Sequence, residues 1–347
     1  MYHLWEEARM GPLTLKNRTV RSATNEHLAE TDGRLTQAWV NSMVQLAQNE
    51  VGLIISGQLA VDGNQRADAG QPVLDERTDL ALLQAAAEGV HAFGGRMVIQ
   101  LSHTGQKAPE ALNGCPPKSP GGFTLEELDS LVAQFVASAK RCQQAGLDGV
   151  QIHCAHGYLL SSFLNPAENL RTDEYGGSLE NRFRLIHRIL EAVRAACGPD
   201  FALLAKIDSD GCGDLHGLLK LLQDADIDGA EVSGLDLLVR AGQKSPFYLD
   251  ALTAAKEGIQ FPLILVGGIF SRAAAEQVLA AGIPFVSFAR ALICQPDFLV
   301  RLKAGTQEES PCLACNGCYR VYRQRHVRCV THTEPIPQLV KNFGGAS

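Results

Sequence analysis

Short apolar runs alternate with longer helix-like stretches along most of the chain. Several of the short runs are continuously apolar, which is typical of strands buried on both faces of a sheet. The eight strands that this pattern predicts span residues 19–22, 51–57, 97–101, 149–153, 202–207, 229–233, 262–267 and 285–289.

The stretches between these runs predict helices. Thr78, Ser178 and Ser271 are suited to cap helix N-termini, and Gly146 and Gly282 are suited to end helices. The predicted helices span residues 36–49, 78–93, 125–145, 178–197, 214–226, 246–256 and 271–281.

Strands that alternate with helices predict an α/β protein, and eight such units favour a closed parallel (β/α)8 barrel, the TIM barrel. A doubly wound sheet is the alternative fold, but no G-x-G-x-x-G motif follows the first strand. Residues 11–18 precede that strand and are expected to form a small hairpin at the barrel floor. We therefore predict a barrel over residues 1–305 and a short Cys-rich tail over residues 306–347.

The composition is compatible with one large domain. The chain has 347 residues, of which 46% are hydrophobic, and a net charge of −7. This charge argues against a nucleic-acid surface, which requires a basic patch. The first residues lack the basic start and apolar run of a signal peptide, and no stretch reaches the roughly 18 apolar residues that would span a bilayer. We expect a cytoplasmic protein with a small-molecule substrate and no membrane partner; a homo-oligomer is compatible with these features.

Polar side chains are predicted at the C-terminal ends of several strands, where (β/α)8 barrels carry their active sites. The seventh predicted strand ends with Gly267, which Gly268 follows, and the eighth ends with Ala289, which Arg290 follows. Loops at these two places commonly bind phosphate, because glycines expose backbone N–H groups and arginine binds phosphate with two hydrogen bonds. A tight glycine turn with a surface arginine is the alternative interpretation.

The fourth predicted strand ends with His153, and His156 and Tyr158 follow it. Two imidazole donors suit a carbonyl oxygen that gains negative charge, and a phenol can protonate the neighbouring carbon. A metal site lacks an acidic partner at the same strand end, and core packing is the other alternative.

Lys206 ends an otherwise apolar strand. A cation here would stabilise negative charge on a group bound at the mouth of the barrel. The alternatives are an ion pair with Asp208 or Asp210, and a lysine that forms a Schiff base as in aldolases.

Six segments together resemble the old yellow enzyme family, the NADH:flavin oxidoreductase group. The similarity covers about residues 3–305, and residues 171–182 (R-T-D-E-Y-G-G-S-L-E-N-R) are its most specific block. The other five segments are residues 11–18, 100–105, 152–163, 266–269 and 289–292.

The resemblance implies a role for each matching position. Tyr158 would donate a proton, His153 and His156 would bind the substrate's carbonyl oxygen, and His27 would lie near the substrate. The residues implied to bind FMN are Ala23, Thr24, Asn25, Gly57, Gln100, Lys206, Gly267, Gly268, Ala289 and Arg290. Two departures stand out: the family more often has arginine at Lys206, and the first strand ends in Ser-Ala-Thr-Asn instead of a Pro-containing turn.

Four cysteines in the tail, Cys312, Cys315, Cys318 and Cys329, follow the spacing C-x2-C-x2-C-x10-C. Three thiolates at this spacing and a distant fourth suit a [4Fe–4S] cluster. Zinc and unligated thiols are the alternatives. The pattern resembles the branch of the family that contains dienoyl-CoA reductase and trimethylamine dehydrogenase, and a cluster here would need an external electron-transfer partner or serve a structural role.

The resemblance implies an oxidoreductase of the ene-reductase type. NADH or NADPH would reduce FMN, and hydride would then pass from flavin N5 to the activated C=C bond of an α,β-unsaturated carbonyl compound. A flavin-dependent amine dehydrogenase or demethylase that passes electrons through the cluster is the alternative, and a flavin-free lyase using Lys206 is a third hypothesis.

Overall fold

The computed structural model describes residues 2–321 and 327–332. Its central feature is a closed barrel of eight parallel strands in the order β10-β3-β4-β5-β6-β7-β8-β9, so the predicted (β/α)8 barrel is confirmed. The strands are β3 (Thr19–Arg21), β4 (Leu53–Ala60), β5 (Arg96–Ser102), β6 (Gly149–Cys154), β7 (Ala202–Asp208), β8 (Gly229–Ser233), β9 (Leu263–Val266) and β10 (Phe285–Phe288).

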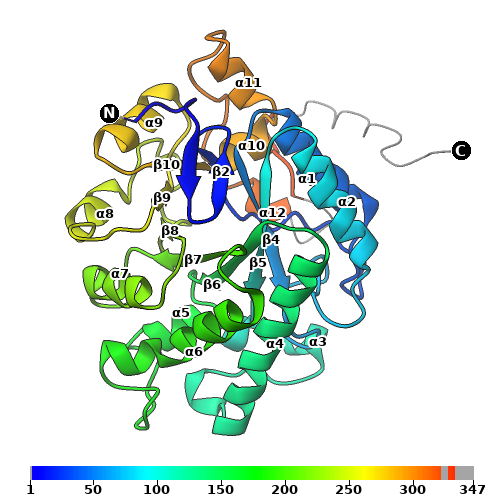
Figure 1. The fold of residues 1–347 in the computed structure, drawn as a ribbon, viewed down its shortest axis with the longest axis vertical. Coiled ribbons are helices and arrows are strands. Elements are labelled where there is room, and N and C mark those ends of the chain that lie inside the picture. Colours follow the sequence, from blue (N-terminus) through cyan, green and yellow to red (C-terminus); the bar gives the residue numbers. More distant parts are fainter. Residues whose placement is uncertain (1, 322–326, 333–347) are drawn as a thin grey trace, which may run out of the picture.

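Helices surround the barrel (Figure 1). Those after successive strands are α1 (Gln37–Gln48), α2 (Leu80–His91), α4 (Leu125–Gln144), α6 (Leu179–Cys197), α7 (Leu215–Asp224), α8 (Leu249–Ala255), α9 (Arg272–Ala280), α10 (Arg290–Cys294) and α11 (Phe298–Lys303). Shorter helices lie within loops or the tail, and these are η1 (Gly105–Lys107), α3 (Glu110–Asn113), η2 (Pro120–Gly122), α5 (Leu159–Leu164) and α12 (Cys318–Val321).

Two of the three predicted N-caps are confirmed. The side chains of Ser178 and Ser271 accept hydrogen bonds from the first turns of α6 and α9. The prediction for Thr78 was wrong, because Asp79 caps α2 by accepting a hydrogen bond from the Ala81 N–H. The Thr78 hydroxyl instead accepts a hydrogen bond from the backbone N–H of Asp75, at 3.0 Å, in the preceding turn.

The N-terminal end of the barrel is closed by an antiparallel hairpin of β1 (Ala8–Met10) and β2 (Leu13–Leu15), seen in front of the strands in Figure 1. Met10 and Leu15 are fully buried and pack in one apolar cluster with barrel residues that include Leu204 and Phe285. The predicted floor hairpin is thereby confirmed, and the chemistry is left to the opposite end.

Residues that point into the barrel change from apolar to polar towards the C-terminal end. On β7, Leu204 belongs to the apolar floor cluster, whereas Lys206 and Asp208 follow at the same alternation, and both are buried. Alternate residues of a strand lie on one face, so the polar pair lies directly above the floor. The barrel thus carries a buried polar layer just below its C-terminal mouth.

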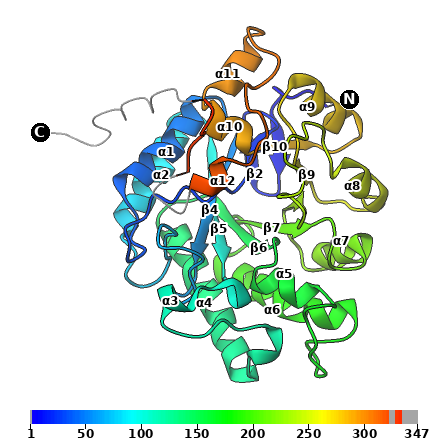
Figure 2. The same cartoon turned by 180° about the vertical axis from the view of Figure 1, so that it is seen from behind.

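The described part of the tail returns over this mouth. Backbone hydrogen bonds join Ser310 to Phe270, Gly242 to Ala314, and Val327 to Glu26, at 2.7, 2.9 and 3.0 Å. Figure 2 views the molecule from this end and shows α12 in front of the strands. The boundary at residue 305 stays a prediction. Among the described residues, no helix has the length and apolar character needed to cross a membrane.

Candidate active site

The buried polar layer joins four strands, β5 to β8, and the residue that follows β3 through side-chain contacts. Gln100 donates to Gln151 at 2.7 Å, and Gln151 donates to Glu231 at 3.3 Å. Lys206 forms an ion pair with Glu231 at 3.1 Å and donates to Ser22 at 2.8 Å. The structure therefore connects Gln100 and Lys206, two predicted FMN-binding residues, through side chains that the sequence analysis did not single out.

The ion pair of Lys206 differs from the alternative that the sequence suggested. The partner is Glu231 of β8, which lies opposite Lys206 in the strand register, and not Asp208 or Asp210. Burial alone would raise the pKa of Glu231. The charge of Lys206 and a hydrogen bond from Ser287 outweigh this effect and hold the pKa below its ordinary value.

The end of β3 is organised by two acidic side chains. Glu26 pairs with Arg21 at 2.5 Å and accepts a hydrogen bond from the backbone N–H of Gly57 at 3.0 Å. Asp68 accepts from the Asn25 amide at 2.8 Å and contacts His27 Nδ1 at 2.6 Å. Predicted site residues from β3 and β4 are thereby held side by side. Of their immediate neighbours, Ala23 is partly buried and Thr24 is buried.

His153 near the end of β6, and His156 and Tyr158 just after it, do lie together. The ring of His153 is 5.2 Å from the ring of His156 and 5.2 Å from the ring of Tyr158, measured between centroids. Burial lowers the pKa of His156 to about 3 and that of His153 well below its ordinary value. Both imidazoles are therefore neutral near pH 7 and act as hydrogen-bonding groups without charge.

The phenol and one imidazole have partners that the sequence analysis did not identify. The Gln58 side-chain amide donates to the Tyr158 hydroxyl at 3.0 Å, so the hydroxyl is the acceptor in this contact. His156 Nε2 contacts the Ser233 hydroxyl at 2.9 Å. Among the described residues, the buried Nδ1 of His153 has no hydrogen-bond partner, as expected for a donor or acceptor whose partner is a ligand.

At the predicted phosphate site, packing against other parts of the protein accounts for the glycines, and Arg290 has hydrogen-bond partners in the tail. Gly267 and Gly268 have φ values of 118° and 76°, and a Cβ on Gly268 would lie 1.7 Å from the Ser245 carbonyl oxygen. Protein packing alone therefore requires glycine at this turn. Arg290 is buried at the start of α10, where it follows Ala289 and donates to Asn316 at 2.5 Å and to the Ala314 carbonyl at 3.2 Å. The guanidinium thus connects the segment after β10 with the tail.

Five cysteines line one small cavity between α10 and the tail. They are the four predicted ligands, Cys312, Cys315, Cys318 and Cys329, together with Cys294 of α10. The sulfurs of Cys294 and Cys329 are 3.6 Å apart, and a hydrogen bond from Cys294 lowers the pKa of Cys312 to about 6. In the described part of the chain no three ligand side chains converge at metal-binding distance. The cavity brings the donors together without forming a closed cage.

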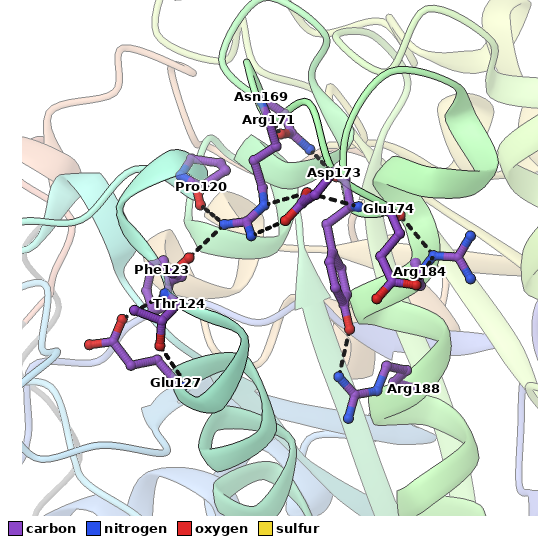
Figure 3. A network of polar contacts seen from close by, with 11 residues as sticks. Pro120, Phe123, Thr124, Glu127, Asn169, Arg171, Asp173, Glu174, Arg184 and Arg188 are labelled. Atoms are coloured by element: carbon purple, nitrogen blue, oxygen red, sulfur yellow. Dashed lines mark hydrogen bonds and ion pairs between the residues drawn. The ribbon is translucent and has the colours of Figure 1, made fainter.

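The most specific block of the sequence resemblance has an architectural role (Figure 3). Arg171 donates to the Pro120 and Phe123 carbonyl oxygens at 2.8 and 2.7 Å and pairs with Asp173 at 2.5 Å. The Phe123 ring in turn lies 5.8 Å from the ring of His103 at the end of β5. The block therefore braces the loops that form one wall of the mouth.

Sequence reasoning missed Gln58, Glu231, Ser233 and Cys294. A signal existed for two of them. Glu231 is a single charge within an apolar strand, as Lys206 is, and Cys294 follows the eighth strand four residues after Arg290. Gln58 and Ser233 lacked such a signal, because polar residues near strand ends are common and only the fold shows which of them meet.

Comparison with known proteins identifies the family. The model described as "NADH:flavin oxidoreductase / NADH oxidase family" matches residues 3–309. An NADH oxidase from Thermoanaerobacter brockii is 31% identical, over 95% of this chain and 56% of that protein. A 4,4'-dithiodibutanoate disulfide reductase from Rhodococcus erythropolis is 30% identical, over 91% of this chain and 92% of that protein.

The fold agrees with this assignment. The solved structure of an old yellow enzyme homologue from Zymomonas mobilis superposes with a TM-score of 0.77 at 23% identity, over 93% of this chain and 99% of that one. The chain spans about half the length of the first of the two relatives and nearly all of the second. The match of the family model over most of the barrel decides the point: this chain belongs to the NADH:flavin oxidoreductase family, the family of old yellow enzyme.

Proposed function

We propose that this chain is an ene-reductase, which uses FMN and NADH or NADPH to reduce the activated C=C bond of an α,β-unsaturated carbonyl compound. The observation that carries the proposal is the cluster of His153, His156 and Tyr158. His153 lies opposite Lys206 in the register of β6 against β7, and His156 and Tyr158 follow β6 at its C-terminal end. A carbonyl-binding pair of imidazoles beside a phenol is what this reaction requires from a protein.

The residues present fit FMN. Lys206 has three N–H donors, and Ser22 and Glu231 are the two acceptors that it contacts in the described chain, which leaves one donor for the N1/O2 side of a flavin. Gln100 would bind the ring edge together with Gly57, and Ala23, Thr24 and Asn25 would lie against the ring. The phosphate would be held by Gly267, Gly268, Ala289 and Arg290.

Bound FMN would supply the chemistry of hydride transfer, accepting hydride from the nicotinamide and passing it on to the substrate. The chain's own residues would orient the substrate and manage the proton. His153 and His156, both neutral, would donate hydrogen bonds to the carbonyl oxygen and stabilise the negative charge that develops there. Tyr158, oriented by Gln58, would protonate the α-carbon. His27, fixed by Asp68, would line the substrate side.

The test begins with the absorption spectrum and the flavin content of the purified protein. Under anaerobic conditions, NADH or NADPH should bleach the flavin, and an enone such as 2-cyclohexenone should restore its colour while the saturated ketone forms. A protein that binds no FMN would refute the cofactor assignment. A flavin that the nicotinamide reduces but that no enone, enal or enoate reoxidises would refute ene-reduction alone.

The cysteine cavity favours a second candidate, a flavin-dependent amine dehydrogenase or demethylase that passes electrons through a [4Fe–4S] cluster. Cys312, Cys315, Cys318 and Cys329 would be its ligands, with zinc as the alternative metal, and an external protein would accept the electrons. Iron, sulfide and zinc analysis of anaerobically purified protein distinguishes these occupants. Reduction of the flavin by an amine, without nicotinamide, would favour the dehydrogenase.

A flavin-free lyase is the weakest hypothesis. A Schiff-base lysine must present an uncharged amine to its substrate, whereas Lys206 is buried in an ion pair with Glu231. Borohydride trapping of a carbonyl compound on Lys206 would be the observation that supports the lyase hypothesis.

A further inference from the structure

Glu231 is the most deeply buried charged side chain in the polar layer, with 0% of its surface exposed, and it lies opposite Lys206 in the β7–β8 register. Its Oε2 atom is 3.1 Å from Lys206 Nζ. Neither group is reached by solvent, since Lys206 is only 2% exposed. Water and salt therefore screen the interaction of these two charges very little.

The pair is held in position by neighbours from other strands. Ser287 of β10 donates to Glu231 Oε1 at 2.6 Å, and Gln151 of β6 donates to Oε2 at 3.3 Å. Lys206 donates to Ser22 at 2.8 Å. A buried ion pair is tolerated when hydrogen bonds satisfy the remaining polar atoms, and that condition is met here. The carboxylate therefore stays beside the ammonium instead of moving into solvent.

We propose that Glu231 is a positioning residue that balances the charge of Lys206 and thereby lowers the reduction potential of the flavin bound above it. This inference rests on the proposed FMN site. Reduction places negative charge near Lys206, and an unpaired ammonium would stabilise that charge strongly. With a carboxylate 3.1 Å from the ammonium, the layer presents an ion pair with no net charge. The pair stabilises the negative charge of the reduced flavin less than an unpaired ammonium would, so the reduced flavin is the stronger hydride donor.

The decisive variant is Glu231→Gln, which keeps the shape and an oxygen acceptor for Ser287 but removes the negative charge. At a fixed potential set by a reference dye, the ratio of reduced to oxidised flavin should rise at least tenfold, which corresponds to about 30 mV for a two-electron couple. Ser287→Ala is the matched control, because it removes one hydrogen bond to Glu231 and leaves both charges in place. Its ratio should change less than threefold.

The double variant Lys206→Met/Glu231→Gln covers the case in which Glu231→Gln does not fold, since replacement of both members of a buried pair is often well tolerated. It removes a neutral pair, so its ratio should stay within about threefold of the wild type. A tenfold shift towards oxidised flavin would show that Lys206 acts as an uncompensated cation and would overturn the proposal. So would an unchanged ratio in a folded, FMN-loaded Glu231→Gln protein. Wild-type protein without flavin would instead refute the proposed function on which the inference rests.

Discussion

The carboxylate of Asp208 accepts a hydrogen bond from the backbone N–H of His156 at 2.8 Å. His156 has a φ of 65°, a left-handed conformation that is uncommon for a residue other than glycine. The same carboxylate oxygen accepts from the Ser161 hydroxyl at 2.9 Å, and Ser161 accepts from the Gly157 N–H at 3.0 Å. Asp208 thus holds the turn that presents the second imidazole.

This relationship predicts a specific pH dependence of stability. Burial raises the pKa of Asp208 from 3.8 to about 7. Between these values the folded protein keeps a proton that the unfolded chain has lost. The contribution of Asp208 to stability is therefore fully present below about pH 4 and is lost as the pH rises through about 7. Relative to Asp208→Asn, the wild type should lose on the order of 4 kcal/mol between pH 4 and pH 8.

Urea unfolding of both proteins across this range measures the difference. Asp210→Asn is the control, because Asp210 is exposed only two residues away and should show no comparable change relative to the wild type. If the difference in unfolding free energy between the wild type and Asp208→Asn stayed constant across this range, the pKa of Asp208 would not be raised in the folded protein.

Tyr158→Phe should separate the two half-reactions. The phenol is needed only when the substrate is protonated, so reoxidation of reduced flavin by an enone should slow by about 10²- to 10⁴-fold, whereas reduction by the nicotinamide should remain nearly intact. Stopped-flow absorbance resolves the two steps. Gln58→Leu should have a smaller effect of the same kind, since Gln58 orients the hydroxyl. Equal slowing of both half-reactions in Tyr158→Phe would remove the proton-donor role.

His156→Ala should weaken the binding of phenolate inhibitors to the oxidised flavoprotein. A hydrogen bond to a charged group contributes about 1.5–3 kcal/mol, so the dissociation constant should rise by roughly 10- to 100-fold. A titration followed by the spectral change of the flavin gives this constant. His187→Ala, on the outer helix α6, is the control and should bind like the wild type. Unchanged affinity in His156→Ala would show that His156 does not bind the ligand oxygen.

The cysteine cavity contains the four predicted cluster ligands and one further cysteine, Cys294, which serves as an internal control. If a [4Fe–4S] cluster is bound, Cys315→Ala should lose most of the iron and acid-labile sulfide. Cys294→Ala should retain them, because Cys294 lines the same cavity but lies outside the C-x2-C-x2-C-x10-C motif. Analysis of both variants after anaerobic purification makes the comparison. Comparable iron loss in Cys294→Ala would mean that the fifth cysteine is a ligand.

Arg171→Ala should destabilise the protein without altering the flavin. The substitution leaves the carbonyl oxygens of Pro120 and Phe123 without their donor and breaks the pair with Asp173. A loss of about 2–3 kcal/mol in unfolding free energy is expected. Differential scanning calorimetry and the flavin spectrum provide the two readings, and a changed flavin spectrum at unchanged stability would place Arg171 in the active site instead.

Much of the architecture was determined by the order of residues alone. Continuous apolar runs can satisfy their burial only inside a sheet covered on both faces, so all eight strands were predicted near their observed positions. The sequence also predicted that polar residues at the strand ends, such as His153, His156 and Tyr158, lie at one end of the barrel, because the C-terminal ends of parallel strands share one mouth.

Which side chains meet was decided only by the tertiary structure. Lys206 and Glu231 are 25 positions apart, and their pairing depends on the register of β7 against β8. Cys294 and Cys329 approach each other because the tail folds back over α10. Local sequence encodes periodicity and turns through short-range sterics, whereas a charge finds its partner through the closure of the barrel, which no single segment specifies.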